Sequence, residues 1–577
     1  MEDLQDKLIQ AHEDGLLWDA IDEEYLCDRS DDALLPRALI HLHNDGTLDL
    51  VNIYSSLECT SDKHDLYSLL RVFEKVLPDL NAQVEDVANC IKHLILASDG
   101  NPDANGMIRP FRKFCEKKPE RPTKLLELAL SELDEQFNLL SVAIEAGSSF
   151  NAQFYISKAI ELLDHKNELI AERAVMALGW LQYDCEALQT DSAQAMLKAS
   201  QNITSDSFLA ASLRSLFSVT HQSNSCKHIF MEFLDQHEEH YGENYVHAAS
   251  NLLFFEDSKI SDTEETRLLN LCSHLKPQNT GSINNVDHAL ERLLKRKEFT
   301  TCGTFLEELF ENTKYKLPVK YFDGFIRTLH QNRDTYLSTL VTRWLLSQNF
   351  NLGAFCEQLF DLSDKGVSIS FDKSLLINQP DGTHLFLARK ACGWFFLQPK
   401  TAMSLIKSLI EDAPENELEG IQNILFNPLL ISYPSNIHKH LDEMKLSEDK
   451  NTLNTAQILI EQFEKFEKGL KSASEINELR PSEQNRHSYW KHHSKLMDES
   501  MKKARSESPL LSLFCNESIL LYGNKSIHYI HNGDKKFRQE IPLQKHSHSF
   551  ELASMHYLDP HGLENMTWQF KAEGCHS

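Results

Sequence analysis

The sequence predicts a mainly α-helical protein, an α-solenoid of antiparallel helical hairpins with a small C-terminal antiparallel β module. Three observations lead to this fold class. Between residues 32 and 480, apolar residues recur every three or four positions, and alternating runs are absent. The periodic segments are mostly about 12–17 residues long and joined by short polar links, as in paired antiparallel helices. After residue 510, alternating runs punctuated by Asn-Gly pairs replace the helical pattern.

The first elements follow from charge and periodicity. Residues 1–31 are acidic but include Leu16, Leu17 and Trp18, so we expect an arm or the first cap of the array. The next clear helix opens near Ser61, a candidate N-cap, and places Phe73 and other apolar residues on one stripe. Similar stripes continue through residues 32–480, which we interpret as one solenoid.

One pattern occurs twice in the predicted helices. The Gly-Trp pair in AERAVMALGWL (171–181) returns 214 positions later in LARKACGWFFL (387–397), and the small residues before it align as well. Both stretches resemble the second helix of HEAT-type repeats, at the level of fold and most strongly over 150–220 and 382–426. The resemblance implies that the small residues let neighbouring helices approach. It also implies that Trp180 and Trp394 are core residues.

The last helix of the predicted solenoid differs from the others, because its apolar residues form a narrow seam. Phe463, Phe466 and Leu470 follow the alternating spacing of a coiled coil. The seam is only about two and a half heptads long, which is short for a self-sufficient coiled coil. It therefore packs against the last solenoid layer or binds a helix of a partner, and these three residues are our candidates for partner binding.

The C-terminal part of the sequence changes in composition. Residues 481–509 are predicted to form a polar, mildly basic linker helix, and residues 510–577 a β-rich module. In this module, Asn532-Gly533 marks a hairpin turn. We expect a further strand near 549–557, a turn at Asp559-Pro560-His561-Gly562 and a last element around Trp568.

Charge restricts the choice of partner. The net charge is −28, which favours a basic protein partner and argues against extended contact with nucleic acid. Two small basic clusters remain as candidate phosphate contacts, one at a predicted helix end and one on the predicted hairpin: Arg292, Lys295, Arg296 and Lys297, and Lys535, Lys536 and Arg538.

No catalytic motif is present, and we predict no cofactor, no catalytic residue and no enzymatic activity. The sequence lacks a phosphate-binding Gly-rich loop, a nucleophile elbow and closely spaced cysteine pairs. Histidines are frequent after residue 480, and His546 and His548 would share one face of a strand. They are weak candidate metal ligands, and they support an alternative function as a metal-dependent hydrolase or nuclease.

The sequence thus favours a non-catalytic scaffold that acts as an accessory subunit of a protein complex. Stacked helical hairpins form extended binding surfaces. By analogy of fold, the expected partner is a larger ATPase of the structural-maintenance-of-chromosomes type, or a nuclease, in a prokaryotic antiviral defence or DNA-maintenance system. We expect a cytoplasmic location and no membrane contact, because the chain lacks a secretory signal and a long apolar segment.

Overall fold

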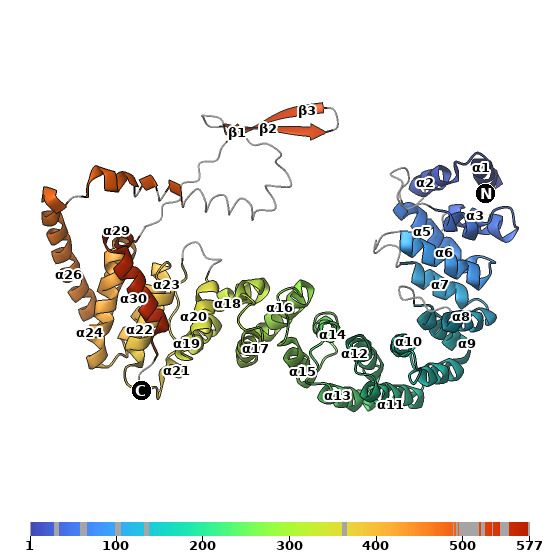
Figure 1. The fold of residues 1–577 in the computed structure, drawn as a ribbon, viewed down its shortest axis with the longest axis horizontal. Helices are drawn as coiled ribbons and strands as arrows, with labels where there is room; N and C mark the ends of the chain where they lie inside the picture. Colours follow the sequence, from blue (N-terminus) through green and yellow to red (C-terminus); the bar gives the residue numbers. More distant parts are fainter. Residues whose placement is uncertain are drawn as a thin grey trace. The chain divides into compact units, whose positions relative to one another are not determined.

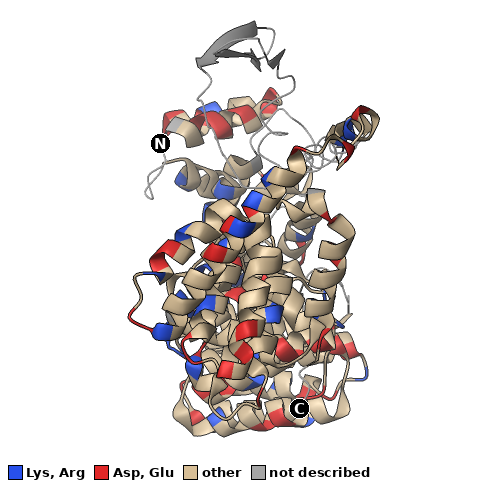
Figure 2. Ribbon diagram, turned by 90° about the vertical axis from the view of Figure 1, so that its left-hand side faces the viewer, with Lys and Arg blue, Asp and Glu red and all other residues tan. Residues whose placement is uncertain are grey.

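A computed structural model describes residues 2–27, 34–57, 66–97, 106–131, 138–360, 366–479, 481–488, 490–491, 494–495, 519–520, 525–532, 535–542 and 553–574. The chain divides into two compact units, residues 1–328 and 329–577, a division that the sequence analysis does not make. Charged residues of both signs are interspersed along the helices (Figure 2). Among the described residues, no helix is both long enough and apolar enough to cross a membrane.

The first unit is built from helices. Its α-helices are α1 (Glu2–Glu13), α2 (Leu17–Cys27), α3 (Leu34–Asn44), α4 (Leu50–Ser55), α5 (Leu66–Val76), α6 (Val84–Ala97), α7 (Ile108–Cys115), α8 (Glu120–Ser131), α9 (Leu139–Leu162), α10 (Glu168–Trp180), α11 (Glu186–Asn202), α12 (Asp206–Thr220), α13 (Lys227–Gln236), α14 (Glu243–Phe255), α15 (Asp262–Cys272), α16 (Thr280–Lys295), α17 (Phe299–Asn312) and the start of α18 (Asp323–Gln331). The short helices η1 (Leu77–Asp79), η3 (Asn224–Cys226) and η4 (Val319–Tyr321) lie between them.

These helices pack in two rows, as the helical-repeat pattern predicts (Figure 1). One row runs through α3, α5, α7, the first half of α9, α10, α12, α14 and α16, and the other includes α4, α6, α8, α11 and α13. Helix α9 serves both rows because its backbone leaves the helical conformation at Asn151. The predicted N-terminal arm or cap contains α1 and α2, which contact α3 and α5 and bury Leu8 and Ile21.

Hydrogen bonds join successive layers across 30 to 41 residues of sequence, and several of them cap the start of a helix. The Asn81 amide donates to the side chain of Asn44, 37 residues earlier, over 2.7 Å. The Asp206 carboxylate accepts the Asn244 and Tyr245 amides, 38 and 39 residues later, at 2.8 and 3.0 Å. Asp287 accepts the Gly324 amide, 37 residues later, at 2.8 Å. The aspartates therefore supply N-terminal caps to helices of the next layer.

Close helix contacts explain the first Gly-Trp pair. A Cβ atom on Gly179 would lie 2.7 Å from the backbone Cα of Ser215 in α12, so only glycine fits without movement. The Gly179 carbonyl also accepts a hydrogen bond from the Ser218 hydroxyl at 2.7 Å. The prediction that Trp180 belongs to the core is wrong, since 41% of its surface is exposed, whereas Trp394 is buried. Trp180 is the last residue of α10. The backbone becomes extended at Leu181, and the neighbouring helices of the row do not cover the Trp180 ring.

The second unit is arranged around α22. Its α-helices are α19 (Ser338–Leu346), α20 (Phe350–Gln358), α21 (Lys373–Leu376), α22 (Thr383–Trp394), α23 (Pro399–Ile410), α24 (Glu415–Ile424), α25 (Pro434–Met444), α26 (Lys450–Ser474), α29 (Met555–Leu558) and α30 (Pro560–Ala572), with the shorter helices η5 (Arg333–Leu337), η6 (Leu425–Leu430) and η7 (Asn477–Leu479). Helix α22 contacts α20, α23, α24 and α30.

The C-terminal helix α30 packs closely against α22, at the second Gly-Trp pair. A Cβ atom on Gly393 would lie 3.0 Å from Cβ of Phe570. The Lys571 ammonium lies 4.5 Å from the centre of the Trp394 ring, and Lys390 donates to the Lys571 carbonyl at 2.6 Å. The repeated Gly-Trp pattern thus marks a close helix contact in each unit. Gly179 contacts the next-but-one helix, α12, whereas Gly393 contacts α30, which is distant in the sequence.

The predicted β-rich module at 510–577 is wrong, although the mainly α-helical class is confirmed. The residues from 555 to 572, where we expected a strand, a turn and a last element, form α29 and α30. The Asp559-Pro560 signal is a helix start rather than a turn, because the Asp559 side chain caps Gly562 and Pro560 occupies the first helical position. In the described part of 510–577, strands are limited to β1 (Ile519–Leu520), β2 (Lys525–Asn532) and β3 (Lys535–Pro542), paired antiparallel in the order β1-β2-β3.

We predict that Gly179→Ala lowers the stability of the first unit by about 1–3 kcal/mol, because its methyl group would overpack the contact between α10 and α12. Gly281→Ala in α16 is the matched control, since a Cβ atom on Gly281 would meet no heavy atom within 4 Å. The control should be neutral or stabilising by up to about 1 kcal/mol, as alanine is the better helix former. Calorimetric unfolding of both full-length variants tests this, and equal effects would contradict the packing argument.

Candidate functional site

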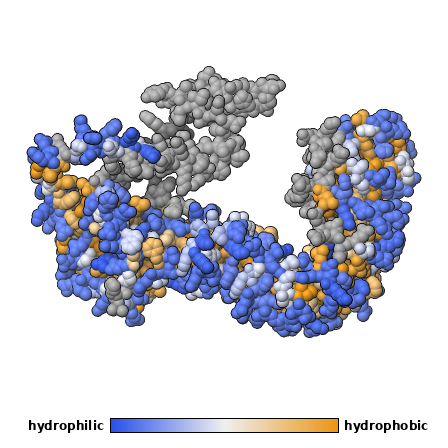
Figure 3. Space-filling view, in the orientation of Figure 1, coloured by the Kyte–Doolittle hydropathy of each residue, from blue (hydrophilic) through white to orange (hydrophobic). Residues whose placement is uncertain are grey.

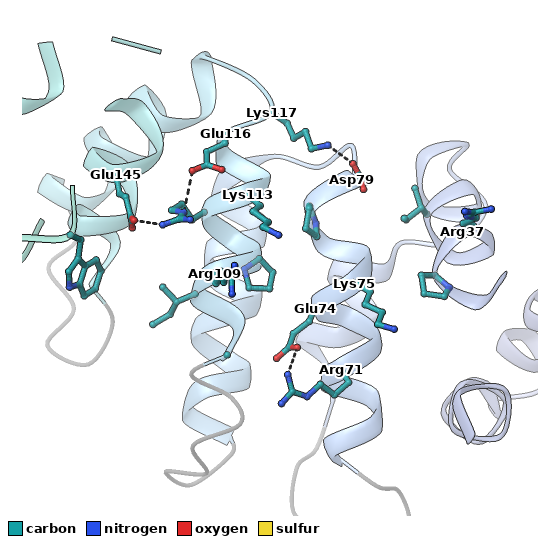
Figure 4. Close-up of a pocket in the computed structure, with 18 residues that line it drawn as sticks. Arg37, Arg71, Glu74, Lys75, Asp79, Arg109, Lys113, Glu116, Lys117 and Glu145 are labelled. Carbon is teal, nitrogen blue, oxygen red and sulfur yellow. Dashed lines mark hydrogen bonds and ion pairs between the residues drawn. The ribbon is translucent and has the colours of Figure 1, made fainter. Parts of the chain in front are cut away.

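A concavity of about 1510 Å³ opens along α3, α5 and α7 in the first unit (Figure 4). Its lining is rich in charge. The basic lining residues outnumber the acidic ones: Arg37, Arg71, Lys75, Arg109, Arg112, Lys113 and Lys117 against Glu74, Asp79, Glu116 and Glu145. The concavity therefore carries positive charge, whereas the first 100 residues of the chain are strongly acidic.

Some of these basic residues are neutralised by neighbours. Arg71 pairs with Glu74 at 2.8 Å, and Lys117 pairs with Asp79 at 2.9 Å. Arg112 pairs with two carboxylates of the lining, those of Glu116 at the end of its own helix and of Glu145 on α9. Burial raises the pKa of Glu145, and the Arg112 guanidinium opposes that shift. These pairs hold the walls together and leave little charge available for a ligand.

Three other basic residues have no acidic partner within the described part of the chain. Lys75 on α5, and Arg109 and Lys113 on α7, are exposed and line the concavity. Arg109 and Lys113 are four residues apart and therefore share one face of α7. The opposite face is held in the core by Phe111 and Phe114, which are fully buried. The amphipathic character of α7 thus directs two positive charges toward the opening.

An aromatic side chain lines the same concavity. Trp180, at the end of α10, contributes its exposed ring, and Ile40 and Ile108 add apolar surface. The site therefore combines unpaired cations with a flat apolar surface. This combination suits an extended anionic ligand with apolar groups better than a small isolated anion, since the concavity exceeds the roughly 300–1,000 Å³ of typical small-molecule pockets.

This concavity is not among the sites predicted from the sequence, although the sequence contains a signal for it. Arg37, Lys75 and Lys113 are separated by 38 residues each, and Arg71 and Arg109 by the same interval. This interval lies within the 30 to 41 residues that the hydrogen bonds between layers span. A search for basic residues recurring at the repeat period, rather than for contiguous basic runs, would have found the cluster.

The basic cluster predicted at 292–297 is largely neutralised by acids. Arg296 pairs with Glu265, which is buried, and with Glu298 at 3.1 Å. Arg292 lies 3.7 Å from Glu265 and donates to a backbone carbonyl of α14, while Lys295 pairs with Glu291 at 2.8 Å. Only Lys297, next to these residues, has no such partner within the described chain. The cluster therefore holds α16 to its neighbours.

The remaining predicted site residues fall into two groups. In the seam of α26, Phe463 is buried, Phe466 is partly buried, and Leu470 is 47% exposed. The Phe466 ring packs at 6.2 Å from Phe426, so the first part of the seam contacts its own unit. Lys535, Lys536 and Arg538 lie on β3, but their side chains are outside the described part of the structure. The candidate metal ligands His546 and His548 lie outside the described residues altogether.

Within the described ranges, no three His, Cys, Asp or Glu side chains gather as a metal site would require. No known family model matches the chain, and no curated protein matches it significantly. The site is therefore interpreted from its own geometry. Hydrophilic side chains cover most of the visible face of the molecule (Figure 3).

We predict that Arg296→Gln destabilises the first unit by about 1–3 kcal/mol, because the buried Glu265 carboxylate loses its closest cation. Lys297→Gln, at the adjacent position, is the control and should change stability by less than about 0.5 kcal/mol. Thermal unfolding of the two variants provides the measurement. A phosphate-binding role would be supported instead if both variants kept normal stability while losing affinity for a duplex DNA probe.

Proposed function

We propose that the protein is a non-catalytic helical-repeat scaffold whose first unit binds an anionic region of a partner protein in the cationic concavity. The observation that carries this proposal is the group formed by Lys75, Arg109 and Lys113, which is exposed in a concavity and lacks acidic partners among the described residues. Exposed cations without partners keep their charge available for a ligand, and complementary charge accelerates and orients association.

This proposal changes the expected chemistry of the partner. The overall charge of −28 favours a basic partner, but the concavity selects an acidic one. The two expectations are compatible, because a repeat array offers separate surfaces to separate partners. A role as accessory subunit of a larger assembly rests on this capacity to hold several chains.

We predict that the full-length triple variant Lys75→Glu/Arg109→Glu/Lys113→Glu loses at least about tenfold in affinity for fluorescent poly-L-glutamate, as three attractions become repulsions. The matched control is Lys124→Glu/Lys166→Glu/Lys198→Glu, which makes the same change of net charge at exposed positions of the same unit. Fluorescence anisotropy at low and moderate salt gives the affinities.

The control separates local from global electrostatics. If both triple variants lose affinity equally, the chain responds to net charge alone and the concavity is not the binding site. If the wild-type chain does not bind the polymer at all, the proposed function is wrong. Circular dichroism of each variant establishes that the helices remain folded, so that a loss of binding is not a loss of structure.

A further inference from the structure

We infer that the face of α22 around Gly393 is a binding surface for the C-terminal end of a helix, and that α30 occupies it as a removable intramolecular ligand. When α30 leaves, the surface receives a helix of a partner protein whose end has the same chemistry. This inference concerns the second unit alone. It does not depend on the cationic concavity or on the function proposed for it.

A notch in α22 admits the incoming helix. Gly393 has no side chain, and a Cβ atom at this position would lie 3.0 Å from Cβ of Phe570 and 3.1 Å from the amide nitrogen of Lys571. Helix α30 lies beside α22 and also contacts α20, although it is distant from both in sequence (Figure 1). Because the notch receives mainly helix backbone, it fits a helix without requiring the particular sequence of α30.

Two cations beside the notch recognise the end of the helix. The last carbonyl groups of a helix have no partner within it, and Lys390 donates to the carbonyl of Lys571, in the last turn of α30, over 2.6 Å. Arg389 pairs with the carboxylate of Glu573, the first residue beyond the helix. Both positive charges also complement the negative end of the helix dipole. The surface therefore selects a helix that ends at Lys390 and carries a carboxylate directly after its last turn.

The packing of α30 suits exchange, because the helix is only partly embedded. Leu563 is the single buried residue of α30, all of which the structure describes, and Trp568 is 62% exposed. A pocket of about 370 Å³ remains between α22 and the pair formed by α29 and α30, and Trp394 and Phe396 line it. Permanent cores are close-packed and leave few spaces of this size. Helix α30 is therefore docked on the unit rather than built into its core.

The docked state also carries an electrostatic penalty. Lys390 is only 4% exposed, and burial lowers the pKa of its ammonium group, an effect that the nearby Glu573 carboxylate opposes. Moving an ammonium group out of water is unfavourable unless acceptors replace its hydration shell. Release of α30 uncovers the Lys390 ammonium and removes this penalty. The docked and released states are therefore closer in free energy than for a contact between apolar surfaces.

The test supplies α30 as a separate molecule. A fluorescent peptide of residues 553–574 is titrated into the full-length wild-type chain and into a full-length tail variant, Leu563→Asp/Glu573→Arg, whose own α30 is displaced by a buried charge and by repulsion between cations. Fluorescence anisotropy should show at least about tenfold tighter binding to the tail variant, because its α22 face is vacant. The control variant Asn565→Asp/Gln569→Arg introduces the same residues at exposed positions of α30 and should bind the peptide as weakly as the wild type.

A charge exchange tests the recognition of the helix end. Adding Arg389→Glu to the tail variant should weaken its binding of the peptide several-fold, because the peptide carboxylate then meets a like charge. A peptide carrying Glu573→Arg should restore the affinity, since the ion pair forms again with its signs reversed. A peptide that adhered to apolar surface alone would not respond to this exchange.

The remaining outcomes overturn the inference. It fails if the wild-type chain and the tail variant bind the peptide equally, or if neither binds it. It fails as well if circular dichroism shows that the tail variant loses more helix than α30 contains, since α30 would then belong to the core. If light scattering shows dimers of the tail variant that the peptide does not dissociate, the occupant is a second copy of the chain rather than a partner's helix. The triple variant of the concavity should bind the peptide like the wild type, so that failure here is distinguishable from failure of the proposed function.

Discussion

The layers of the first unit are fixed to one another by acidic and amide side chains that bind backbone groups of the neighbouring layer. The first amides of a helix have no partner within that helix, and Asp206 satisfies two of them at the start of α14. Asp287 does the same for the helix that begins after Phe322. Because each carboxylate can reach only one pair of amides, neighbouring layers cannot slide. These contacts therefore fix the register between the layers that they join.

Much of the fold could be predicted from the sequence because helices bury one stripe and leave a periodic trace. The exceptions are informative. Asp559-Pro560 is compatible with both a turn and a helix start, since aspartate and proline favour both, and only the contact of α30 with α22 decides between them. Trp180 matches a core pattern in the sequence. Its ring is nevertheless exposed, because α10 ends at this residue and the fold leaves the ring uncovered there.

The candidate site was less predictable than the fold, because ion pairs between residues distant in sequence decide which cations are available. The closely spaced basic residues at 292–297 predict a phosphate contact from the sequence. In the structure, Arg292 and Arg296 both pair with Glu265, some thirty residues earlier. The cations of the concavity are isolated in sequence and surrounded by acids, so that local charge counts hide them. Whether a cation is available to a ligand depends on its neighbours across layers, and this information lies in the repeat period rather than in the local sequence.

The contact of α30 with α22 also orders the events of biosynthesis. The hydrogen bonds between layers of the first unit join residues 30 to 41 positions apart, so each can form soon after its two helices leave the ribosome. The bonds from Lys390 to Lys571 and from Arg389 to Glu573 span 181 and 184 positions. Until residue 573 has been translated, the face of α22 around Gly393 stays uncovered. The nascent second unit therefore exposes a helix-sized surface at a time when the first can already be folded, and this surface is where a chaperone would bind.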